Sequence, residues 1–259
     1  MALALITGSY GGLGNALSIV HARTGGDLIL VGRSQDKLDA QAATLRQAYR
    51  IKVHTIAVDL SQEDAAYTIF DICSQENLLP DYLINNAGFG GQGDFARERS
   101  LEADMSMIAV NIETPTRLLK LFLPEMIQRG SGKVLNVSSI AALAPGPLQA
   151  VYFATKAYVT SWSNALAKEL AGTGVSVSCF MPGAMETGFA QTSGLDDTDL
   201  FKNAVSPDKA AQEAYNEMLN GKINIFAAVR TWQKPLLPLI SILPRKRVLD
   251  YIYRLQKRH

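Results

Sequence analysis

The chain has only two cysteines and three histidines among its 259 residues, too few for a disulfide framework or a histidine-rich metal centre. Cys73 and Cys179 are distant from each other and each lies in an apolar stretch, so we expect two core thiols and a reducing compartment. His21, His54 and His259 have no ligand spacing. We therefore expect the histidines at the surface and no metal site.

The sequence also lacks long hydrophobic runs, linkers and repeats. Its first residues, MALALITGSYGGLG, have neither the basic region nor the long apolar core of a signal peptide, so we expect a cytoplasmic protein. No Ser/Gly/Pro-rich stretch divides the chain, and its length suits one α/β sheet with helices on both faces. We predict a single domain over residues 1–259.

An excess of charge of one sign is missing from most of the chain. With 25 basic and 24 acidic residues the net charge is +1. The last fifteen residues carry +5, which leaves −4 for residues 1–244 and argues against a nucleic-acid partner. The charged residues of this tail are Arg245, Lys246, Arg247, Arg254, Lys257 and Arg258, against Asp250.

Short apolar runs rich in β-branched residues alternate with helix-length segments. The runs predict strands at 3–7, 27–32, 53–58, 82–85, 133–138, 175–180 and 223–229. The longer segments predict helices at 13–24, 35–50, 62–76, 104–129, 152–171 and 207–220, with Ser61, Ser100 and Ser206 available as starts. This alternation predicts an α/β fold of Rossmann type, a doubly wound parallel sheet of about seven strands with helices on both faces.

The expected strand ends carry the polar and glycine-rich segments of the chain. In an open parallel sheet, ligands bind outside the carboxyl ends of the strands. The turn at 7–14 follows the first strand, 85–88 end the fourth, Ser138 and Ser139 end the fifth, and 182–187 follow the sixth. We expect these four segments to form one rim.

The turn TGSYGGLG joins the first strand to a helix and has the spacing GxxxGxG. Its glycines allow a tight turn and let a pyrophosphate approach the N–H groups of the helix. A turn that only connects strand to helix is the alternative, although the strand before it and the helix after it favour a dinucleotide.

The second strand ends in Val31, Gly32 and Arg33, with no acid where a ribose 2′-hydroxyl would need one. A guanidinium there suits a 2′-phosphate and predicts NADP(H), unless Arg33 is a solvated loop residue. Asp59, after the third strand, suits an adenine amino group or the cap of the following helix.

Tyr152 and Lys156 lie one helical turn apart, so both reach the same face. The ammonium would favour the phenolate and lower a tyrosine pKa that is ordinarily ~10, which makes the pair a candidate acid. Tyr253 and Lys257 have the same spacing, so the pair alone is insufficient evidence. Context must therefore decide between the two pairs.

Asn111 lies within the predicted helix 104–129, four residues before Pro115. Proline would deprive the Asn111 carbonyl of its helical partner, so we expect a kink and a carbonyl able to hold a water leading toward Lys156. An asparagine tolerated on an exposed helix face is the alternative.

These motifs, in order over residues 1–187, resemble the short-chain dehydrogenase/reductase family: TGSYGGLG, NNAG at 85–88, Asn111, the VSS serine, YxxxK and the PG pair at 182. The resemblance implies a catalytic tetrad of Asn111, Ser139, Tyr152 and Lys156. Ser139 would bind the substrate oxygen and Tyr152 would protonate it, Lys156 would hold the nicotinamide ribose, and Asn111 would keep the relay water. Ser139 is preferred to Ser138 because the family's interval to the tyrosine is thirteen.

The same resemblance implies the residues that contact NADP(H). They are Gly8, Ser9, Tyr10, Gly12, Leu13, Gly14, Arg33, Ser34, Asp59, Leu60, Asn86, Ala87, Gly88, Tyr152, Lys156, Pro182, Gly183 and Thr187. Tyr10 and Gly11 stand where the family has a small polar pair, and no basic residue precedes Gly12, which leaves Arg33, helped by Ser34 and Lys37, to select the 2′-phosphate.

Two regions concern the substrate and partners. Residues 186–206 correspond to the family's substrate lid, in which Phe189, Leu195, Leu200 and Phe201 would form an apolar wall, with Asp196, Asp197 and Asp199 nearby. The tail 235–259 is basic and amphipathic, with Val248, Ile252 and Leu255 along one stripe. We favour packing of this stripe on protein over docking on an anionic membrane or lipid-like substrate.

The sequence as a whole predicts an NADPH-dependent oxidoreductase that interconverts a hydrophobic ketone or aldehyde and its alcohol. The resemblance implies a homodimer or homotetramer formed through the helices that carry Asn111 and Tyr152. The rival interpretation is a non-catalytic NADP(H)-sensing protein on the same fold, which would not require the proton donor. A third interpretation is a dehydratase or epimerase, although relatives with these activities usually belong to the longer, extended branch of the family.

Overall fold

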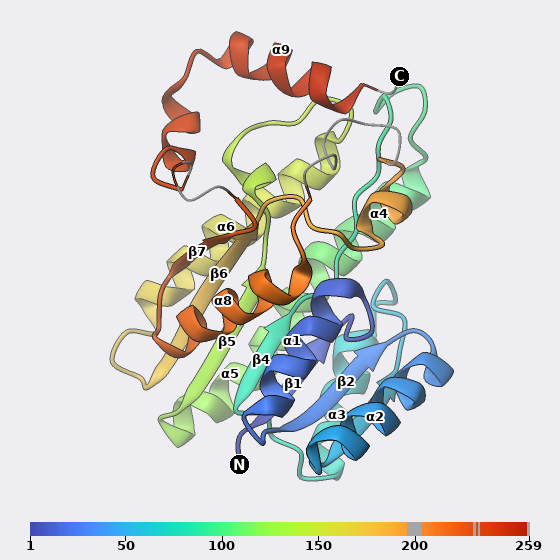
Figure 1. Cartoon of the computed structure of the whole chain (residues 1–259), viewed down its shortest axis with the longest axis vertical. Coiled ribbons are helices and arrows are strands. Elements are labelled where there is room, and N and C mark those ends of the chain that lie inside the picture. Colours follow the sequence, from blue (N-terminus) through green and yellow to red (C-terminus); the bar gives the residue numbers. More distant parts are fainter. Residues whose placement is uncertain (196–203, 230–231, 233, 258–259) are drawn as a thin grey trace.

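The computed structural model describes residues 1–195, 204–229, 232 and 234–257. Within them, seven parallel strands form one sheet in the order β3-β2-β1-β4-β5-β6-β7 (Figure 1). The strands are β1 (Leu3–Thr7), β2 (Asp27–Gly32), β3 (Val53–Ala57), β4 (Tyr82–Asn85), β5 (Gly132–Val137), β6 (Val175–Pro182) and β7 (Asn224–Ala227). The predicted fold class is confirmed.

Alternate residues of each strand supply the two hydrophobic layers that hold the helices. Leu5 of β1 is level with Ile29 of β2 and Leu83 of β4, and all three face one layer. Ala4 and Ile6 face the other. This alternation is the geometric consequence of successive side chains pointing to opposite faces of a strand.

Helices cover both layers. One face carries α1 (Gly12–Arg23), α2 (Gln35–Tyr49) and α8 (Pro207–Leu219), and the other carries α3 (Ala65–Gln75), α5 (Thr114–Arg129) and α6 (Ala150–Glu169). The remaining helices α4 (Leu101–Ile108), α7 (Phe189–Ser193) and α9 (Arg245–Gln256) lie toward the carboxyl-end rim of the sheet, with α9 at the far end of the molecule (Figure 1).

Two of the three predicted serine starts are correct. Ser100 and Ser206 cap α4 and α8 by accepting hydrogen bonds from Ala103 N and Asp208 N. Ser61 does not start α3, which begins only at Ala65. Its N–H and hydroxyl both donate to Asp59 Oδ1, so this pair forms a tight turn before the helix.

The predicted helix 104–129 is interrupted. A π-helical turn, Ala109–Glu113, separates α4 from α5, and the N–H of Thr114 donates to the carbonyl five residues before it. Pro115, which has no N–H, follows directly, as expected of a kink at this point. Asn111 is only 2% exposed, so the alternative of an exposed asparagine is wrong.

The prediction of a surface position for His21 is wrong. The residue is completely buried, with Nδ1 2.7 Å from the Tyr215 hydroxyl and Nε2 3.0 Å from the Asp27 carbonyl. Burial lowers the pKa of the imidazole, and the neighbouring carbonyls oppose this effect. His21 is therefore a hydrogen-bonded core residue.

Two further observations concern the cysteines and the possibility of a membrane-spanning helix. Cys73 and Cys179 are both unpaired and buried, as predicted. None of the helices in the described residues has the length and apolarity needed to cross a membrane.

Candidate active site

The four predicted segments do meet at the carboxyl ends of the strands. The chain winds outward from β1 in both directions, to β2 and β3 on one side and to β4 through β7 on the other. The switch point of this topology lies between β1 and β4, where open α/β sheets bind their ligands. The turn after β1 and the NNAG segment after β4 flank it.

Hydrogen bonds join these two segments. The Asn86 side chain donates from Nδ2 to the carbonyls of Thr7 and Gly8 at 2.9 and 3.1 Å. The N–H groups of Asn86 and Ala87 donate to the Thr7 hydroxyl. The Asn86 amide is therefore engaged in shaping the glycine turn.

The turn itself leaves no room for larger side chains. Gly8 has a φ of +64°, and a Cβ on Gly14 would lie 2.2 Å from the Gly8 carbonyl oxygen. A Cβ on Gly12 would lie 2.6 Å from the Thr187 methyl group, so the segment after β6 touches the start of α1. No side chain caps the N-terminus of α1, and its first turn holds no acid. An uncapped, close-packed helix start of this kind fits a pyrophosphate.

Several residues predicted to contact a cofactor face the interior instead. Ser9 is completely buried and donates to Gln41 Oε1, Leu13 is a core residue, and Leu60 is 5% exposed with its carbonyl bound to the Thr114 hydroxyl. The backbone of Ser9 is engaged as well, since its N–H donates to the Val31 carbonyl and its carbonyl accepts from Gln41 Nε2. Gly183 continues from Pro182 of β6 and packs against Ala228, where a Cβ would lie 2.3 Å from a carbonyl oxygen.

The end of β2 brings Arg33 and Lys37 to the same corner as the Tyr10 ring. The Arg33 N–H donates to the Tyr10 hydroxyl at 3.1 Å, and the Tyr10 ring packs on Gly32. Lys37 Nζ lies 5.7 Å from the centre of the same ring. Ser34 caps α2 by accepting from Lys37 N. Arg33 and Lys37 are both exposed and flank this corner with positive charge.

Asp59 lies close enough to Arg33 to sense its charge. Hydrogen bonds from Ser61 lower the pKa of the Asp59 carboxyl most, and the Arg33 guanidinium lowers it further. Burial opposes these effects. The carboxylate is thus ionised at neutral pH and half-buried at the rim.

Ser138 and Ser139 differ clearly in what they contact. The Ser138 hydroxyl donates to the Lys156 carbonyl at 2.8 Å and pairs with the Thr160 hydroxyl at 2.7 Å, which fastens α6 to the end of β5. Ser139 is half-buried, its hydroxyl accepts from Ala141 N at 3.1 Å, and it lies near enough to Tyr152 to lower the pKa of the phenol. The structure therefore leaves Ser139, the preferred serine, beside the phenol.

Tyr152 and Lys156 are 8% and 4% exposed on the same face of α6. Lys156 Nζ lies 5.9 Å from the centre of the tyrosine ring and donates to the Val137 carbonyl at 2.9 Å. This bond holds the ammonium against the end of β5. The two groups and Ser139 thus come together from β5 and α6.

The expected lowering of the Tyr152 pKa is wrong for this arrangement. Burial raises the pKa of the phenol to about 12, and the Ser139 hydroxyl opposes this only partly. Burial also lowers the pKa of the Lys156 ammonium to about 8, with a smaller opposing influence from Cys179. At neutral pH the pair therefore consists of a protonated phenol and a largely charged amine.

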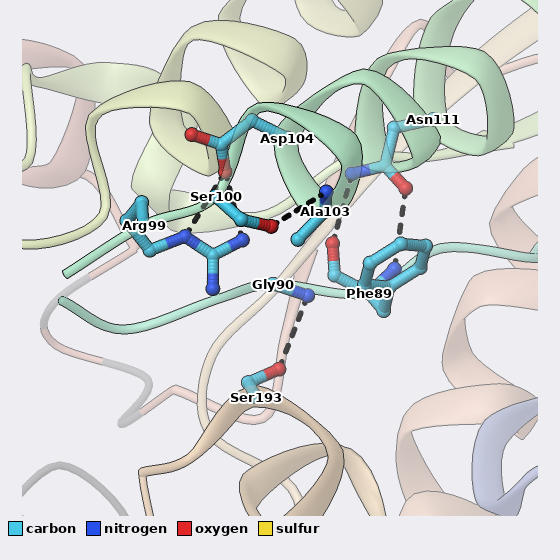
Figure 2. Close-up of polar contacts among 8 residues, drawn as sticks. All are labelled: Phe89, Gly90, Arg99, Ser100, Ala103, Asp104, Asn111 and Ser193. Atoms are coloured by element: carbon cyan, nitrogen blue, oxygen red, sulfur yellow. Dashed lines mark hydrogen bonds and ion pairs between the residues drawn. The ribbon is translucent and has the colours of Figure 1, made fainter. Parts of the chain in front are cut away.

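Asn111 uses its side chain to join three segments. Its Oδ1 accepts from Phe89 N at 3.2 Å and its Nδ2 donates to the Phe89 carbonyl at 3.0 Å (Figure 2). Nδ2 also donates to the Thr155 hydroxyl at 3.0 Å. The Thr155 hydroxyl in turn donates to the Tyr152 carbonyl. Asn111 so fixes the loop after β4 against the helix that carries Tyr152.

Packing explains why the NNAG segment ends in glycine. A Cβ on Gly88 would lie 3.1 Å from both Asn111 Oδ1 and Lys156 Nζ. Gly88 thus lets the end of β4 approach the asparagine and the lysine closely.

Comparison with known proteins agrees with this geometry. The family model for short chain dehydrogenases matches residues 2–198. The chain belongs to this family. A very-long-chain 3-oxoacyl-CoA reductase of Bos taurus is 33% identical over 193 residues, 73% of this chain and 61% of the relative. Sulfoacetaldehyde reductase 2 of Chromohalobacter salexigens is 35% identical over 188 residues, 72% of this chain and 74% of that one.

A solved structure supports the same assignment. The short-chain dehydrogenase of Sphingobium yanoikuyae in complex with NADPH has a TM-score of 0.83 at 29% identity, covering 90% of both chains. This chain nevertheless spans less than two thirds of the length of the bovine reductase. The seven-stranded sheet is thus that of a short-chain dehydrogenase.

The polar wall beside Tyr152 in this short-chain dehydrogenase was missed from the sequence. Gln149, three residues before the tyrosine, is 3% exposed and donates from Nε2 to Gln256 Oε1 at 2.6 Å, while its own Oε1 has no hydrogen-bond partner among the described residues. The Gln92 side chain donates to the Gln256 carbonyl. The signal for Gln149 was its place at the start of the helix that carries Tyr152. Nothing in the local sequence marked Gln256.

The loop after β4 also makes polar contacts in this region. Gly90 N donates to the Ser193 hydroxyl of α7 at 3.1 Å, and Arg99 packs on Gly91 while its Nη2 binds Asp104 Oδ1 at 2.7 Å (Figure 2). The Arg99 and Asp104 side chains are 17% and 9% exposed. This ion pair was also missed, because five residues of separation in a loop have no recognisable pattern.

The predicted lid is described in part. Residues 185 and 205 form an isolated bridge, so the segment between them leaves and returns at one point. Phe189 lies with its ring 5.5 Å from that of Tyr152, and Leu195 is completely buried. The predicted lid residues Leu200 and Phe201, and the three acids Asp196, Asp197 and Asp199, lie outside the described residues.

The predicted stripe of the tail faces the protein. Val248, Ile252 and Leu255 are half-buried, and Gln256 at the end of α9 is 1% exposed. The stripe thus lies on the side of α9 whose Gln256 is hydrogen-bonded to Gln149 and Gln92, which agrees with the favoured alternative of packing on protein.

Proposed function

We propose that this short-chain dehydrogenase is an NADP(H)-dependent oxidoreductase that interconverts a carbonyl compound and its alcohol, with Tyr152 as proton donor. The observation that carries the proposal is the meeting of Ser139, Tyr152 and Lys156 on the rim that also holds the uncapped start of α1. Two fixed hydroxyl donors, one buried and one half-buried, are what a developing negative charge on a carbonyl oxygen requires.

The cofactor would lie along the same rim. The backbone of residues 8–14, Arg33, Asp59, residues 86–88, Lys156 and residues 182–187 would hold it. When bound, NADP(H) supplies or accepts the hydride. Arg33 and Lys37 favour a 2′-phosphate because they are two exposed cations at the end of β2. The related Sphingobium protein, described in complex with NADPH, supports this preference.

The proton chemistry follows from the burial of the pair. With a pKa of about 12, the Tyr152 phenol retains its proton at neutral pH and can donate it to a substrate oxygen held by Ser139. Lys156, still largely charged below its pKa of about 8, stabilises the tyrosinate that remains. Asn111 acts by fixing the loop after β4 and the start of α6, because its side-chain amide is bound to Phe89 and Thr155.

The substrate is proposed to be a hydrophobic ketone or aldehyde. Phe189 and Leu195 give the described part of the lid an apolar character next to Tyr152. Two relatives are named as reductases of carbonyl compounds, a 3-oxoacyl-CoA and sulfoacetaldehyde. A homo-oligomer formed through α5 and α6 remains part of the proposal, to be checked by measuring the mass in solution.

The test is NADPH oxidation with aldehydes, medium-chain ketones, 3-oxoacyl thioesters and steroids. We expect turnover with at least one class and its loss in Tyr152→Phe, which should still bind NADPH. NADPH binding without turnover on any class would favour the sensor alternative. Full activity in Tyr152→Phe would show that the proton donor is another group.

A further inference from the structure

Helix α9 has two faces of different character. Its inward face carries half-buried Val248, Leu249, Ile252 and Leu255, together with buried Gln256. Gln256 is bound by Gln149 and Gln92, so this face is anchored on the wall of the active site. The inward face is therefore occupied by the protein's own residues.

The outward face is basic. At 100° per residue, Lys246, Arg247, Arg254 and Lys257 lie within an arc of about 100° whose centre is opposite Ile252. All four are exposed, and no ion pair of the described residues includes them. Counting Arg245 and subtracting Asp250, residues 245–257 carry five positive charges and one negative, or +4, while residues 1–244 carry −4. The positive charge of the molecule is thus concentrated here.

Exposed apolar side chains accompany these cations. Trp232, Leu236, Leu239 and Leu243, in the segment leading into α9, are 62%, 49%, 47% and 52% exposed. Tyr251 and Tyr253 are 64% and 45% exposed and flank the basic arc on either side. The chain leading into α9 and the helix itself, both drawn in red, lie at the same end of the molecule (Figure 1). We call these residues and the four outward cations the tail surface.

We propose that the tail surface docks on an anionic phospholipid bilayer. Basic side chains attract anionic headgroups, tyrosine and tryptophan favour the headgroup level, and exposed leucines gain free energy by entering the acyl boundary. An acidic protein would match the charge but leaves the three exposed leucines without a reason. Nucleic acid fits less well, because the remaining surface would repel it.

The docking would place the membrane beside the active site. Gln256 links the same helix to Gln149, three residues before Tyr152. A hydrophobic carbonyl compound dissolved in the bilayer would then reach the catalytic rim without crossing water. This second step rests on the proposed function, whereas binding to the membrane does not.

The first test measures binding to sedimenting vesicles, either of phosphatidylcholine alone or of an equal mixture with phosphatidylserine. We expect a strong preference for the mixed vesicles that weakens as salt is added. Since each basic residue near such a surface is worth about fivefold in partitioning, Arg247→Gln/Arg254→Gln should bind roughly 25-fold less.

The matched control is Arg23→Gln/Lys52→Gln, which removes two exposed charges at the opposite ends of the strands. It should bind mixed vesicles like the wild type. Equal losses in both double variants, or no preference of the wild type for anionic vesicles, would overturn the proposal. NADPH binding checks that both variants are folded.

The second test measures reduction of a medium-chain ketone dissolved in mixed vesicles and of a short ketone in water. Arg247→Gln/Arg254→Gln should lose activity on the first substrate and keep it on the second. Tyr152→Phe should lose both activities yet bind vesicles normally, so failure of the proposed function is distinguishable from failure of the docking. Equal activity of the double variant and wild type in vesicles would contradict delivery from the bilayer.

Discussion

Gln149 Nε2 donates a 2.6 Å hydrogen bond to Gln256 Oε1, across 107 positions of the chain. Both side chains are almost completely buried, at 3% and 1% exposure. The bond connects the last turn of α9 with the start of the helix that carries Tyr152. The tail is therefore part of the active-site wall, and its state should influence catalysis.

Replacing Gln256 with Ala should destabilise the protein and impair reduction. The Gln149 amide would lose its partner while remaining buried, which costs about 1–3 kcal/mol. Chemical denaturation would measure the loss of stability, and kcat/KM the effect on the start of α6. Gln212→Ala removes an exposed amide that binds only Asn216, and should stay within ~0.5 kcal/mol of wild type. Equal effects of the two variants would refute a special role for Gln256.

The rate of carbonyl reduction should fall as the pH rises through about 8. Lys156 has a pKa lowered to about 8, so its stabilising charge is present below that pH and lost above it. Tyr152, with its pKa raised to about 12, remains protonated throughout this range. The measurement is kcat/KM against pH. Lys156→Met should be slower at neutral pH and lack this decline; an unchanged profile would assign the titration to another group.

Arg33→Ala should reduce the preference for NADPH over NADH. Losing one charged contact to a 2′-phosphate costs about 1.5–3 kcal/mol, or roughly 10–100-fold in the KM for NADPH, with NADH little affected. Lys37→Ala should have a smaller effect in the same direction. Arg50→Ala removes an exposed arginine beyond the far end of α2 and serves as the control. A constant ratio in Arg33→Ala would show that Arg33 is only a solvated loop residue.

Gly14→Ala should abolish dinucleotide binding and lower stability by more than about 1–3 kcal/mol, the usual cost of overpacking. The new methyl group would lie 2.2 Å from the Gly8 carbonyl oxygen, and backbone cannot yield as a flexible side chain does. Gly188→Ala is the comparison, since its φ is −64° and nothing lies within 4 Å of its Cβ position. Isothermal titration with NADPH and thermal unfolding would distinguish the two.

The sequence alone was enough to predict the strands, the helices and the edge of the sheet at which the candidate site lies. Runs such as LALIT and DLILVG predict buried strands because their β-branched residues suit a sheet covered on both faces, and the breaks between them contain glycine. The alternation of strand and helix then requires the glycine turn, NNAG and Ser139 to lie at one edge. Strands, helices and turn motifs depend mainly on residues that are close together in the sequence, so a local sequence pattern is enough to predict them.

Tertiary structure decided how individual side chains are used. His21 is buried because Tyr215, from a helix nearly two hundred positions away, packs against it. The Tyr152 pKa rises because burial outweighs the opposing effect of the Ser139 hydroxyl, while the Lys156 ammonium is directed at the Val137 carbonyl. Gln149 meets Gln256 only because α9 returns to the start of α6. Contacts of this kind depend on how distant segments pack together, and no spacing along the chain encodes them.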